Sequence, residues 1–371
     1  MVILYLSDST IPSQSANSIN VMKMCQAFSD NGHCVVLYAK SGDKKTRYND
    51  YYKLYSVRKI FDLKLINAGS SRFAKLIYVI TAFIKSITKE SFELVYTRSF
   101  IAALLSVLFR KKLMFEMHQY SRSNNILFRA MLKKILNSVY LIRCIVISNT
   151  LKYDVELDFP SYSNKIFVAH DGADPVLAIE TSQINNDSFN ICYTGSLYYG
   201  KGFEVIYPLS LELPNCEFHV VGGDSKHIST LKSNYKIPRN LHLHGFLEYP
   251  KAEEYRLHAD ILIAPFQDKI LLTDSMNIAR WISPIKLFEY MSTGKPIIAS
   301  NIPAVEEILI HNKTAILVSP NNIDEWVSAI TGLRENPNKY AHLGSNAKSV
   351  FLSKYTWKKR AENIIYGIDD D

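Results

Sequence analysis

Apolar residues in this chain gather in short uninterrupted runs, and amphipathic stretches lie between them. Runs of this length, bounded by polar or glycine residues, are typical of buried strands. The segments predicted as strands are 2–6, 34–39, 94–99, 113–118, 145–148, 189–194, 216–221, 241–245, 259–265 and 296–300. One amphipathic stretch, ended by Asn31-Gly32, places apolar residues on one helical face: Val21, Met24, Cys25 and Phe28. Because strands and helices alternate along the chain, we predict an α/β fold with parallel sheets.

The length of 371 residues fits two domains of ordinary size. Residues 181–188 are polar and weakly patterned, as in a linker. We therefore place an N-terminal domain at 1–178, a second domain at 179–350, and a C-terminal helix in 351–371 that opens at Thr356 and Trp357.

Composition indicates a soluble globular protein with an anionic partner. Hydrophobic residues make up 47% and charged residues 21% of the chain, and 43 basic against 35 acidic residues leave a net charge of +8. This charge suits a nucleotide, a nucleic acid or an anionic lipid, but no block of Lys and Arg indicates a nucleic-acid arm. The five cysteines are scattered, which favours core positions in a reducing compartment over bridges or metal ligands. We find no signal peptide, and the longest apolar runs have about half the ~20 residues that a membrane span needs. We expect a cytoplasmic protein.

The segment 283–300 combines helix signals with a site for an anion. Ser283 is a suitable N-cap, Pro284 fits the first helical position, and Gly294 fits the left-handed end of the helix. The free N–H groups at such a helix start suit a phosphate. Glu289 lies one turn deeper, where a carboxylate can bind the two hydroxyls of a ribose. The alternative is an ordinary surface helix with a solvated Glu.

The sequence SPIKLFEYMSTGKPIIASNIPAVEEIL, starting at Ser283, resembles the donor-binding signature of glycosyltransferase family 4. The resemblance implies the GT-B fold: two facing Rossmann-like domains with an interdomain cleft and a C-terminal helix that crosses back to the first domain. It also implies retaining transfer from a sugar nucleotide, with Glu289 on the ribose. Trp281 stands where the family often has a first Glu, which touches the donor sugar, so the identity of that sugar stays open.

A second glycine-rich turn runs from Gly195 to Gly202. Its spacing is close to that of a Walker loop, but Gly202 replaces the Ser or Thr that would hold Mg²⁺, so we reject a P-loop NTPase. The turn resembles the family's GxxxxxKG turn, in which Lys201 neutralises the leaving diphosphate. Ser196 replaces an Arg that the family often has, and Lys286 is a candidate for the second positive charge. The donor-binding residues implied are Ala16, Asn17, Gly195, Ser196, Ser283, Pro284, Ile285, Lys286 and Leu287.

Three further candidates lie in the first half of the chain. We expect a loop at 7–18, where Ala16 offers its backbone and Asn17 a polar side chain to the donor phosphates. Arg98 ends a strand as in the family's YxR motif, which makes it an acceptor-side candidate or a structural ion-pair residue. His118 matches the family's ExH strand end, and in the family this His lies beside the donor sugar. A lone His after a strand is otherwise more often structural.

Two basic helical segments, 72–89 and 126–136, interleave Lys and Arg with a broad apolar face. Such helices can lie on an anionic membrane surface. The alternative is a core-facing helix with a solvated charged edge. Related enzymes dock this domain on membranes to reach lipid-linked acceptors, so we expect peripheral contact with the inner face of the cell membrane.

The resemblance implies a retaining hexosyltransferase. It would move a sugar from a nucleotide-diphosphate donor to a saccharide or polyprenol-linked acceptor, in assembly of a surface polysaccharide such as lipopolysaccharide O-antigen, capsule or exopolysaccharide. His118, Lys201 and Glu289 are the expected catalytic residues, with no metal and no cofactor. His242 and His244 share one face of a strand, but no carboxylate or thiol stands at ligand spacing. The alternatives are an epimerase or phosphorylase on the same fold, and a non-catalytic nucleotide- or glycan-binding module.

Overall fold

A computed structural model describes residues 1–42, 50–69, 71–120, 126–176, 188–273 and 276–367. The chain divides into two compact units, Met1–Asp171 with Trp357–Asp371 (unit 1) and Gly172–Thr356 (unit 2). The predicted domain boundary at 178 lies outside the described residues, as does most of the predicted linker. The last helix, α14 (Trp357–Ile365), belongs to unit 1.

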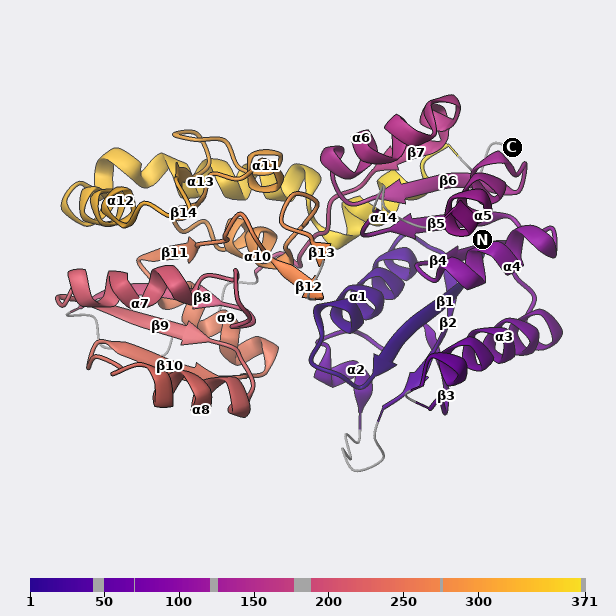
Figure 1. The fold of residues 1–371 in the computed structure, drawn as a ribbon, viewed down its shortest axis with the longest axis horizontal. Helices are drawn as coiled ribbons and strands as arrows, with labels where there is room; N and C mark the ends of the chain where they lie inside the picture. The colour runs from indigo at the N-terminus through magenta and orange to yellow at the C-terminus, as the bar shows by residue number, and fades with distance from the viewer. Residues whose placement is uncertain (43–49, 70, 121–125, 177–187, 274–275, 368–371) are drawn as a thin grey trace. The chain divides into compact units, whose positions relative to one another are not determined.

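Unit 1 contains a seven-stranded parallel sheet in the order β3-β2-β1-β4-β5-β6-β7 (Figure 1). Its strands are β1 Val2–Ile11, β2 Cys34–Ser41, β3 Asp62–Ile66, β4 Leu94–Thr97, β5 Leu113–Met117, β6 Leu141–Val146 and β7 Ile166–Val168. The strand order reverses between β1 and β4, and ligands of open α/β sheets bind at the carboxyl ends of the strands beside such a switch point.

The helices of unit 1 mostly alternate with its strands along the chain. They are α1 Ala16–Asp30, α2 Tyr51–Leu54, α3 Arg72–Lys89, α4 Phe100–Leu108, α5 Ile126–Asn137, α6 Asn149–Asp158, the 3₁₀ turn η1 Pro160–Lys165, and α14. Helix α14 packs against α1, and α4 contacts both α3 and α5. Arg143 of β6 fixes the end of α14, because its guanidinium donates to the carbonyls of Ile364 at 2.5 Å and Tyr366 at 2.6 Å.

Unit 2 contains a six-stranded parallel sheet in the order β10-β9-β8-β11-β14-β15, with the switch point between β8 and β11. Its strands are β8 Phe189–Thr194, β9 Cys216–Val221, β10 Leu241–Gly245, β11 Ile261–Ala264, β14 Ile297–Ser300 and β15 Ile316–Val318. Its helices are α7 Phe203–Glu212, α8 Ser225–Asn234, α9 Tyr249–His258, α10 Ile285–Thr293, α11 Pro303–Glu306, α12 Ile323–Glu335 and α13 Pro337–Lys354.

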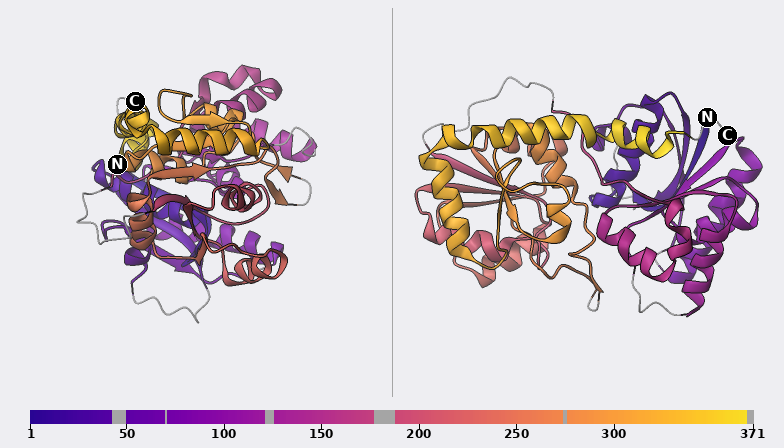
Figure 2. Two further views of the ribbon diagram at one scale, coloured as in Figure 1. Left: turned by 90° about the vertical axis from the view of Figure 1, so that its left-hand side faces the viewer. Right: turned by 90° about the horizontal axis from the view of Figure 1, so that it is seen from above.

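The sheet of unit 2 lies between two helical layers, as Figure 2 shows. One core, around Trp326 and Phe203, joins the sheet to α7 and α12. The other, around Phe288 and Phe351, joins it to α10 and α13. Because both faces are covered, the strands read as the continuous apolar runs seen in the sequence. Two Rossmann-like α/β units confirm the predicted fold class.

One local prediction, that of the loop at 7–18, is wrong. Strand β1 extends to Ile11 and α1 begins at Ala16, so the predicted loop at 7–18 shrinks to four residues. Helix α7 continues through Pro208 to Glu212, because Ile206 and Leu209 are buried in the core and outweigh the missing hydrogen bond. The segment 267–282 contains an antiparallel pair, β12 Leu271–Thr273 and β13 Met276–Asn277. Within the described ranges, no helix is long and apolar enough to span a membrane.

Candidate active site

The loops of unit 2 that follow β8 and β11 meet at the switch point of the sheet. Strand β8 leads into the turn Gly195–Gly202, and β11 leads into Pro265 and Phe266. The backbone N–H of Gln267 donates to the carbonyl of Gly200 at 3.0 Å, which joins the two loops. Candidate residues from separate parts of the sequence are thereby brought to one edge of the sheet.

Two lysines, Lys201 and Lys286, approach the same aromatic ring in this region. The ammonium of Lys286 lies 3.7 Å from the ring centroid of Tyr193 and 5.1 Å from that of Phe266. The ammonium of Lys201 lies 5.7 Å from the Phe266 centroid. Lys286 Nζ is buried without a hydrogen-bond partner among the described residues. A buried cation in this condition is costly unless an anion joins it.

Burial lowers the pKa values of both lysines, and the charge of Lys201 lowers that of Lys286 further. Burial lowers the pKa of Lys201 to about 8. Burial, and then the charge of Lys201, hold the pKa of Lys286 well below its ordinary value, although Glu289 acts in the opposite direction. A bound diphosphate would stabilise the charged form of each lysine.

The turn that follows β8 needs glycine where it approaches the lysines. Gly195 has φ +141°, and a Cβ there would lie 2.6 Å from Lys286 Nζ. A Cβ on Gly222, in the next loop, would lie 2.0 Å from the carbonyl oxygen of Gly195. Tyr193 stabilises the turn, because its hydroxyl is within hydrogen-bond distance of two carbonyl oxygens, that of Ser196 at 2.7 Å and that of Lys201 at 2.9 Å. The backbone here is therefore set by close packing.

Helix α10 begins one residue later than predicted. Pro284, in an extended conformation, is the N-cap, and Ser283 precedes it as a buried residue. Leu287 N–H donates to the Pro284 carbonyl, so the N–H groups of Ile285 and Lys286 are those at the helix start. A proline has no side-chain acceptor to cap them, which leaves this turn suited to an anion. Gly294 ends the helix with φ +77°, as predicted.

Glu289 lies on α10 beside a buried arginine that the sequence analysis missed. Arg256 of α9 is 2% exposed, and its Nη1 lies 3.4 Å from Glu289 Oε2. The segment EEYRLH around Arg256 has only a mixed amphipathic pattern. The sequence feature that could have indicated a buried Arg256 is its place on the helical face that also carries Ala252 and Ala259.

His118 of unit 1 is held by Glu116, which lies two residues earlier at the end of β5. Glu116 is fully buried and accepts hydrogen bonds from Tyr96 and His118. Arg360 of α14 donates to its Oε2 at 3.1 Å. Burial raises the pKa of Glu116, but Arg360 and His118 together bring it well below its ordinary value. Burial, and then Arg98, lower the pKa of His118, so the imidazole is neutral at neutral pH.

Arg98 belongs to the same buried network. Its Nε lies 3.9 Å from Glu116 Oε1, and its Nη1 donates to Asn20 at 3.1 Å. Asn20 in turn donates to Asp171 at 2.6 Å. Arg98 and His118 are thus brought to one edge of the sheet, and Arg98 has the ion-pair role that the sequence analysis left open beside the acceptor-side role.

Ala16 and Asn17 are not in a loop but in the first turn of α1. Ser15 is the N-cap, and its hydroxyl accepts from the N–H of Ser18 at 3.3 Å. Both residues are exposed, and their N–H groups are at the positive end of the helix. Their proposed contact would therefore come from a helix start.

Three histidines of unit 2 form a stack on β9 and β10. His219 stacks on both His242 and His244, and its Nδ1 lies 3.1 Å from Nε2 of His244. Throughout the described part of the chain, no group of three or more His, Cys, Asp or Glu is arranged to hold a metal.

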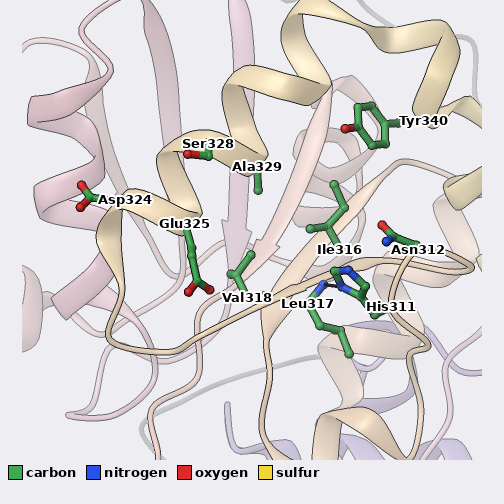
Figure 3. Close-up of a pocket in the computed structure, with 10 residues that line it drawn as sticks. All are labelled: His311, Asn312, Ile316, Leu317, Val318, Asp324, Glu325, Ser328, Ala329 and Tyr340. Atoms are coloured by element: carbon green, nitrogen blue, oxygen red, sulfur yellow. Dashed lines mark hydrogen bonds between the residues drawn. The ribbon is translucent and has the colours of Figure 1, made fainter.

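A cavity of about 490 Å³ lies elsewhere in unit 2, beside the edge strand β15 and α12 (Figure 3). His311 Nδ1 accepts the N–H of Leu317 at 3.0 Å, and Glu325 accepts that of Ser319 at 2.8 Å. These bonds satisfy the backbone of the edge strand. None of the predicted site residues lines this cavity.

Comparisons with known proteins bear on the family match and on the fold. Residues 178–350 match the family model of glycosyl transferases group 1. An uncharacterised glycosyltransferase of Methanocaldococcus jannaschii, MJ1069, is 27% identical over 180 residues, which are 47% of this chain and 43% of that protein. The chain spans about half the length of the curated relatives it matches, 43% and 58%.

Solved structures match over the whole chain. The structure of Anabaena HepE in complex with UDP-glucose has a TM-score of 0.72 and 14% identity, and covers 100% of both chains. WaaG, described as a glycosyltransferase involved in lipopolysaccharide biosynthesis, has a TM-score of 0.65 and 12% identity, covering 98% of this chain and 100% of its own. The chain thus has the GT-B fold, and its residues 178–350 match the family of glycosyl transferases group 1.

Proposed function

We propose that this protein is a glycosyltransferase that moves a sugar from a nucleoside-diphosphate donor to a saccharide or polyprenol-linked acceptor, with retention of configuration. The observation that carries the proposal is the buried, unpartnered ammonium of Lys286 beside Lys201. Both lysines lie near Phe266, and Lys286 is part of the uncapped first turn of α10. A diphosphate is an anion of suitable charge for such a place.

Each candidate residue has a part in this proposal. Lys201, Lys286 and the N–H groups of Ile285 and Lys286 bind the diphosphate. Glu289 accepts hydrogen bonds from the ribose hydroxyls. The contacts with phosphate strengthen as the leaving group gains charge, which lowers the barrier to transfer. His118, neutral and oriented by Glu116, lines the donor sugar. The match to glycosyl transferases group 1 and the UDP-glucose complex of a structural neighbour support these parts.

The remaining candidates complete the donor and acceptor contacts. The backbone of Gly195 and Ser196 and the first turn of α1, at Ala16 and Asn17, bind phosphate oxygens, and Arg98 faces the acceptor. The leaving phosphate itself accepts the proton of the acceptor hydroxyl in this scheme. The protein therefore acts by positioning and charge stabilisation.

We extend the proposal to catalysis without a metal or other cofactor. Two ammonium groups and a helix start supply the positive charge that Mg²⁺ supplies in many phosphate sites. Addition of EDTA is then expected to leave the transfer rate unchanged, and loss of the rate with recovery on adding Mg²⁺ would refute this part.

The test of the function is a transfer assay. A panel of nucleoside-diphosphate sugars is screened by thermal shift, because a ligand of the native state raises the Tm. The active donor is then incubated with saccharide acceptors. Free nucleoside diphosphate should appear only when acceptor is present, and Lys201→Met and Glu289→Ala should abolish its release. Full activity in both variants would refute the site.

The same assay separates the alternatives. An epimerase changes the donor sugar without releasing nucleotide, and a phosphorylase requires inorganic phosphate or nucleotide as co-substrate. A binding module raises the Tm with ligand but releases no product under any condition. Formation of a glycosylated acceptor with the donor's anomeric configuration is the outcome that we expect.

Helix α3 supports attachment of unit 1 to an anionic membrane, at the inner face of the cell membrane. On its inner side, Tyr78, Val79 and Phe83 are buried in unit 1. The packing of α3 on unit 1 therefore does not need its other apolar residues. A second apolar stripe stays exposed on the same helix: Phe73, Leu76, Ile77, Ile80 and Ile84. Exposed apolar stripes of this kind mark interaction surfaces.

Basic residues accompany this stripe and the neighbouring helix α5. Lys75, Lys85 and Lys89 lie on α3, and Lys133 and Lys134 follow the exposed Ile126 and Leu127 on α5. Apolar side chains with flanking lysines suit the interface of an anionic bilayer. A protein attached at the membrane surface would reach a lipid-linked acceptor in surface polysaccharide assembly. WaaG, a structural neighbour, is described as a glycosyltransferase involved in lipopolysaccharide biosynthesis.

Vesicle flotation tests this attachment. Protein should float with phosphatidylglycerol vesicles more than with phosphatidylcholine vesicles, and the double variant Phe73→Ser, Ile77→Ser should lose flotation. Leu211→Ser, an exposed apolar position of unit 2, serves as the control and should float like the wild type. Equal flotation of all three proteins would contradict the assignment of the surface.

A further inference from the structure

Arg256 is a buried charged group that forms an ion pair with Glu289, the proposed ribose-binding carboxylate. It projects from α9, and its guanidinium lies 5.1 Å from the ring centroid of Tyr249. Nη1 lies 3.4 Å from Glu289 Oε2 and Nη2 lies 4.0 Å from Glu253 Oε2. Among the described residues, Nε and Nη2 have no hydrogen-bond partner.

An arginine in this environment contributes little to the stability of the fold. A buried ion pair with incomplete hydrogen bonding is often no more stable than apolar side chains of similar volume. The cation–π contact with Tyr249 compensates for only part of the burial. The arrangement around Arg256 therefore fits a role in the site better than a role in the core.

The geometry of α10 shows what Arg256 does to its neighbours. Lys286 and Glu289 are at positions i and i+3 of the helix, a spacing at which opposite charges can pair. They do not form an ion pair within 4.0 Å in the described structure, and Glu289 pairs with Arg256 instead. Lys286 and Arg256 could each pair with the carboxylate of Glu289, and in the structure Arg256 does so.

We propose that Arg256 is a positioning residue that holds Glu289 away from Lys286. In this arrangement Glu289 keeps its second oxygen for the ribose, and Lys286 keeps its charge for the diphosphate. Without Arg256, Glu289 turns to Lys286, and both halves of the nucleotide lose a contact. This inference rests on the proposed function, since it assigns the ribose and the diphosphate to these two residues.

The test measures binding of three probes by calorimetry: inorganic pyrophosphate, UDP and 2′-deoxy-UDP. In Arg256→Met, the pyrophosphate Kd should rise at least about tenfold, because the liberated carboxylate neutralises Lys286. The ratio of UDP to 2′-deoxy-UDP affinity should also fall toward one. Arg256→Lys should restore part of both effects.

A double variant separates positioning from loss of folding. Glu289→Gln removes the competing charge, so the double variant Arg256→Met, Glu289→Gln should bind pyrophosphate like the wild type. Its affinities for UDP and 2′-deoxy-UDP should still be similar to each other. A merely structural role would leave the double variant as weak as Arg256→Met. Arg239→Met, at an exposed arginine of unit 2, is the matched control and should bind all three probes like the wild type.

The outcomes distinguish the two proposals. If the wild type binds pyrophosphate and UDP, and Arg256→Met binds both as tightly with the same preference for the 2′-hydroxyl, the inference about Arg256 is wrong. If the wild type binds neither pyrophosphate nor any nucleoside diphosphate of the wider panel, the proposed function itself fails.

Discussion

The ammonium of Lys286 lies 3.7 Å from the ring centroid of Tyr193, and no described atom accepts a hydrogen bond from it. The aromatic ring offers a partial compensation for the lost hydration of the ammonium. The pKa of Lys286 is held well below its ordinary value by burial and by Lys201. In the ligand-free protein, this lysine therefore weakens the fold at neutral pH, and an anion would reverse the effect.

Replacement of Lys286 by Met should stabilise the ligand-free protein and abolish nucleotide binding. The apolar side chain keeps the packing on Tyr193 and removes a buried unpaired charge, which we expect to raise the Tm by roughly 2–4 °C. Scanning calorimetry with and without UDP measures both effects.

Lys232→Met is the control for this prediction, because Lys232 is exposed in the last turn of α8. Its Tm should stay within about 1 °C of the wild type, as is usual for surface changes, and its response to UDP should be intact. A lowered ligand-free Tm in Lys286→Met would show that the ammonium has a stabilising partner.

Affinity for a nucleoside diphosphate should fall as the pH rises above about 8. Burial lowers the pKa of Lys201 to about 8, so the lysine is charged below that pH and loses its charge above it. Binding then requires uptake of a proton, and Kd should rise up to about tenfold for each further pH unit. Titrations of UDP in buffers of different ionisation enthalpy detect the proton directly.

The same lysine affects stability with the opposite sign. Its pKa is lowered on folding from an ordinary value of 10.5 to about 8, so the unfolded chain binds more protons between these values. Stability of the ligand-free protein should therefore rise with pH across this window, and Lys201→Met should remove that part of the rise. A UDP affinity that stays constant up to about pH 10 would contradict the assigned pKa.

Gly195→Ala should eliminate nucleotide binding. The residue has φ +141°, and the added Cβ would lie 2.6 Å from Lys286 Nζ, so the lysine must leave its place on Tyr193. Gly245→Ala is the matched control in unit 2: its φ is +71°, but a Cβ there meets its nearest neighbour, the Gly223 carbonyl oxygen, only at 4.0 Å. Both variants carry backbone strain, because each φ lies in the range that L side chains rarely adopt.

Fluorescence-monitored titration with UDP compares the two glycine variants. The control should bind like the wild type despite its strain. If both variants bind equally well, the close approach of Gly195 to Lys286 has no part in the site.

Arg360→Met should destabilise unit 1 by about 3–5 kcal/mol, because it leaves the buried carboxylate of Glu116 without its main partner. Arg360 is 3% exposed, and besides Glu116 it donates to the carbonyl of His170 at 2.7 Å. Urea unfolding measures the change, and Lys358→Met, at an exposed position of the same helix, should cost less than about 0.5 kcal/mol.

Acid titration gives an independent check on this network. Arg360 and His118 hold the pKa of Glu116 well below its ordinary value of 4.5. The stability that Glu116 contributes is therefore present above that value and is lost as the pH falls below it. Arg360→Met should unfold at a higher pH than the wild type, and an unchanged acid transition would contradict the pairing.

Local sequence predicted most strands of the two sheets and the C-terminal end of α10, but it missed the short strands β3, β7 and β15. Strands β8, β9 and β10 have the predicted bounds, because each is a mainly apolar or alternating segment closed by polar or glycine residues. Gly294 ends α10 because a left-handed residue was needed there. These features depend on neighbours in the sequence, which a single chain displays.

The pairs that hold the site together were not predictable in this way. Arg360 and Glu116 are 244 positions apart, and Arg256 and Glu289 lie on different helices. An arginine on an amphipathic helix looks the same whether it meets water or a buried carboxylate. Ser283 failed as the N-cap for a related reason: it is buried, and the helix starts beyond Pro284.

The central claim is that a diphosphate binds at the start of α10, between the two lysines. A crystal structure of the protein with UDP tests it most directly. We expect phosphate oxygens within hydrogen-bond distance of Lys201 Nζ, Lys286 Nζ and the first-turn N–H groups. A nucleotide bound elsewhere, for example in the cavity beside β15, with Lys286 still unpartnered, would contradict it.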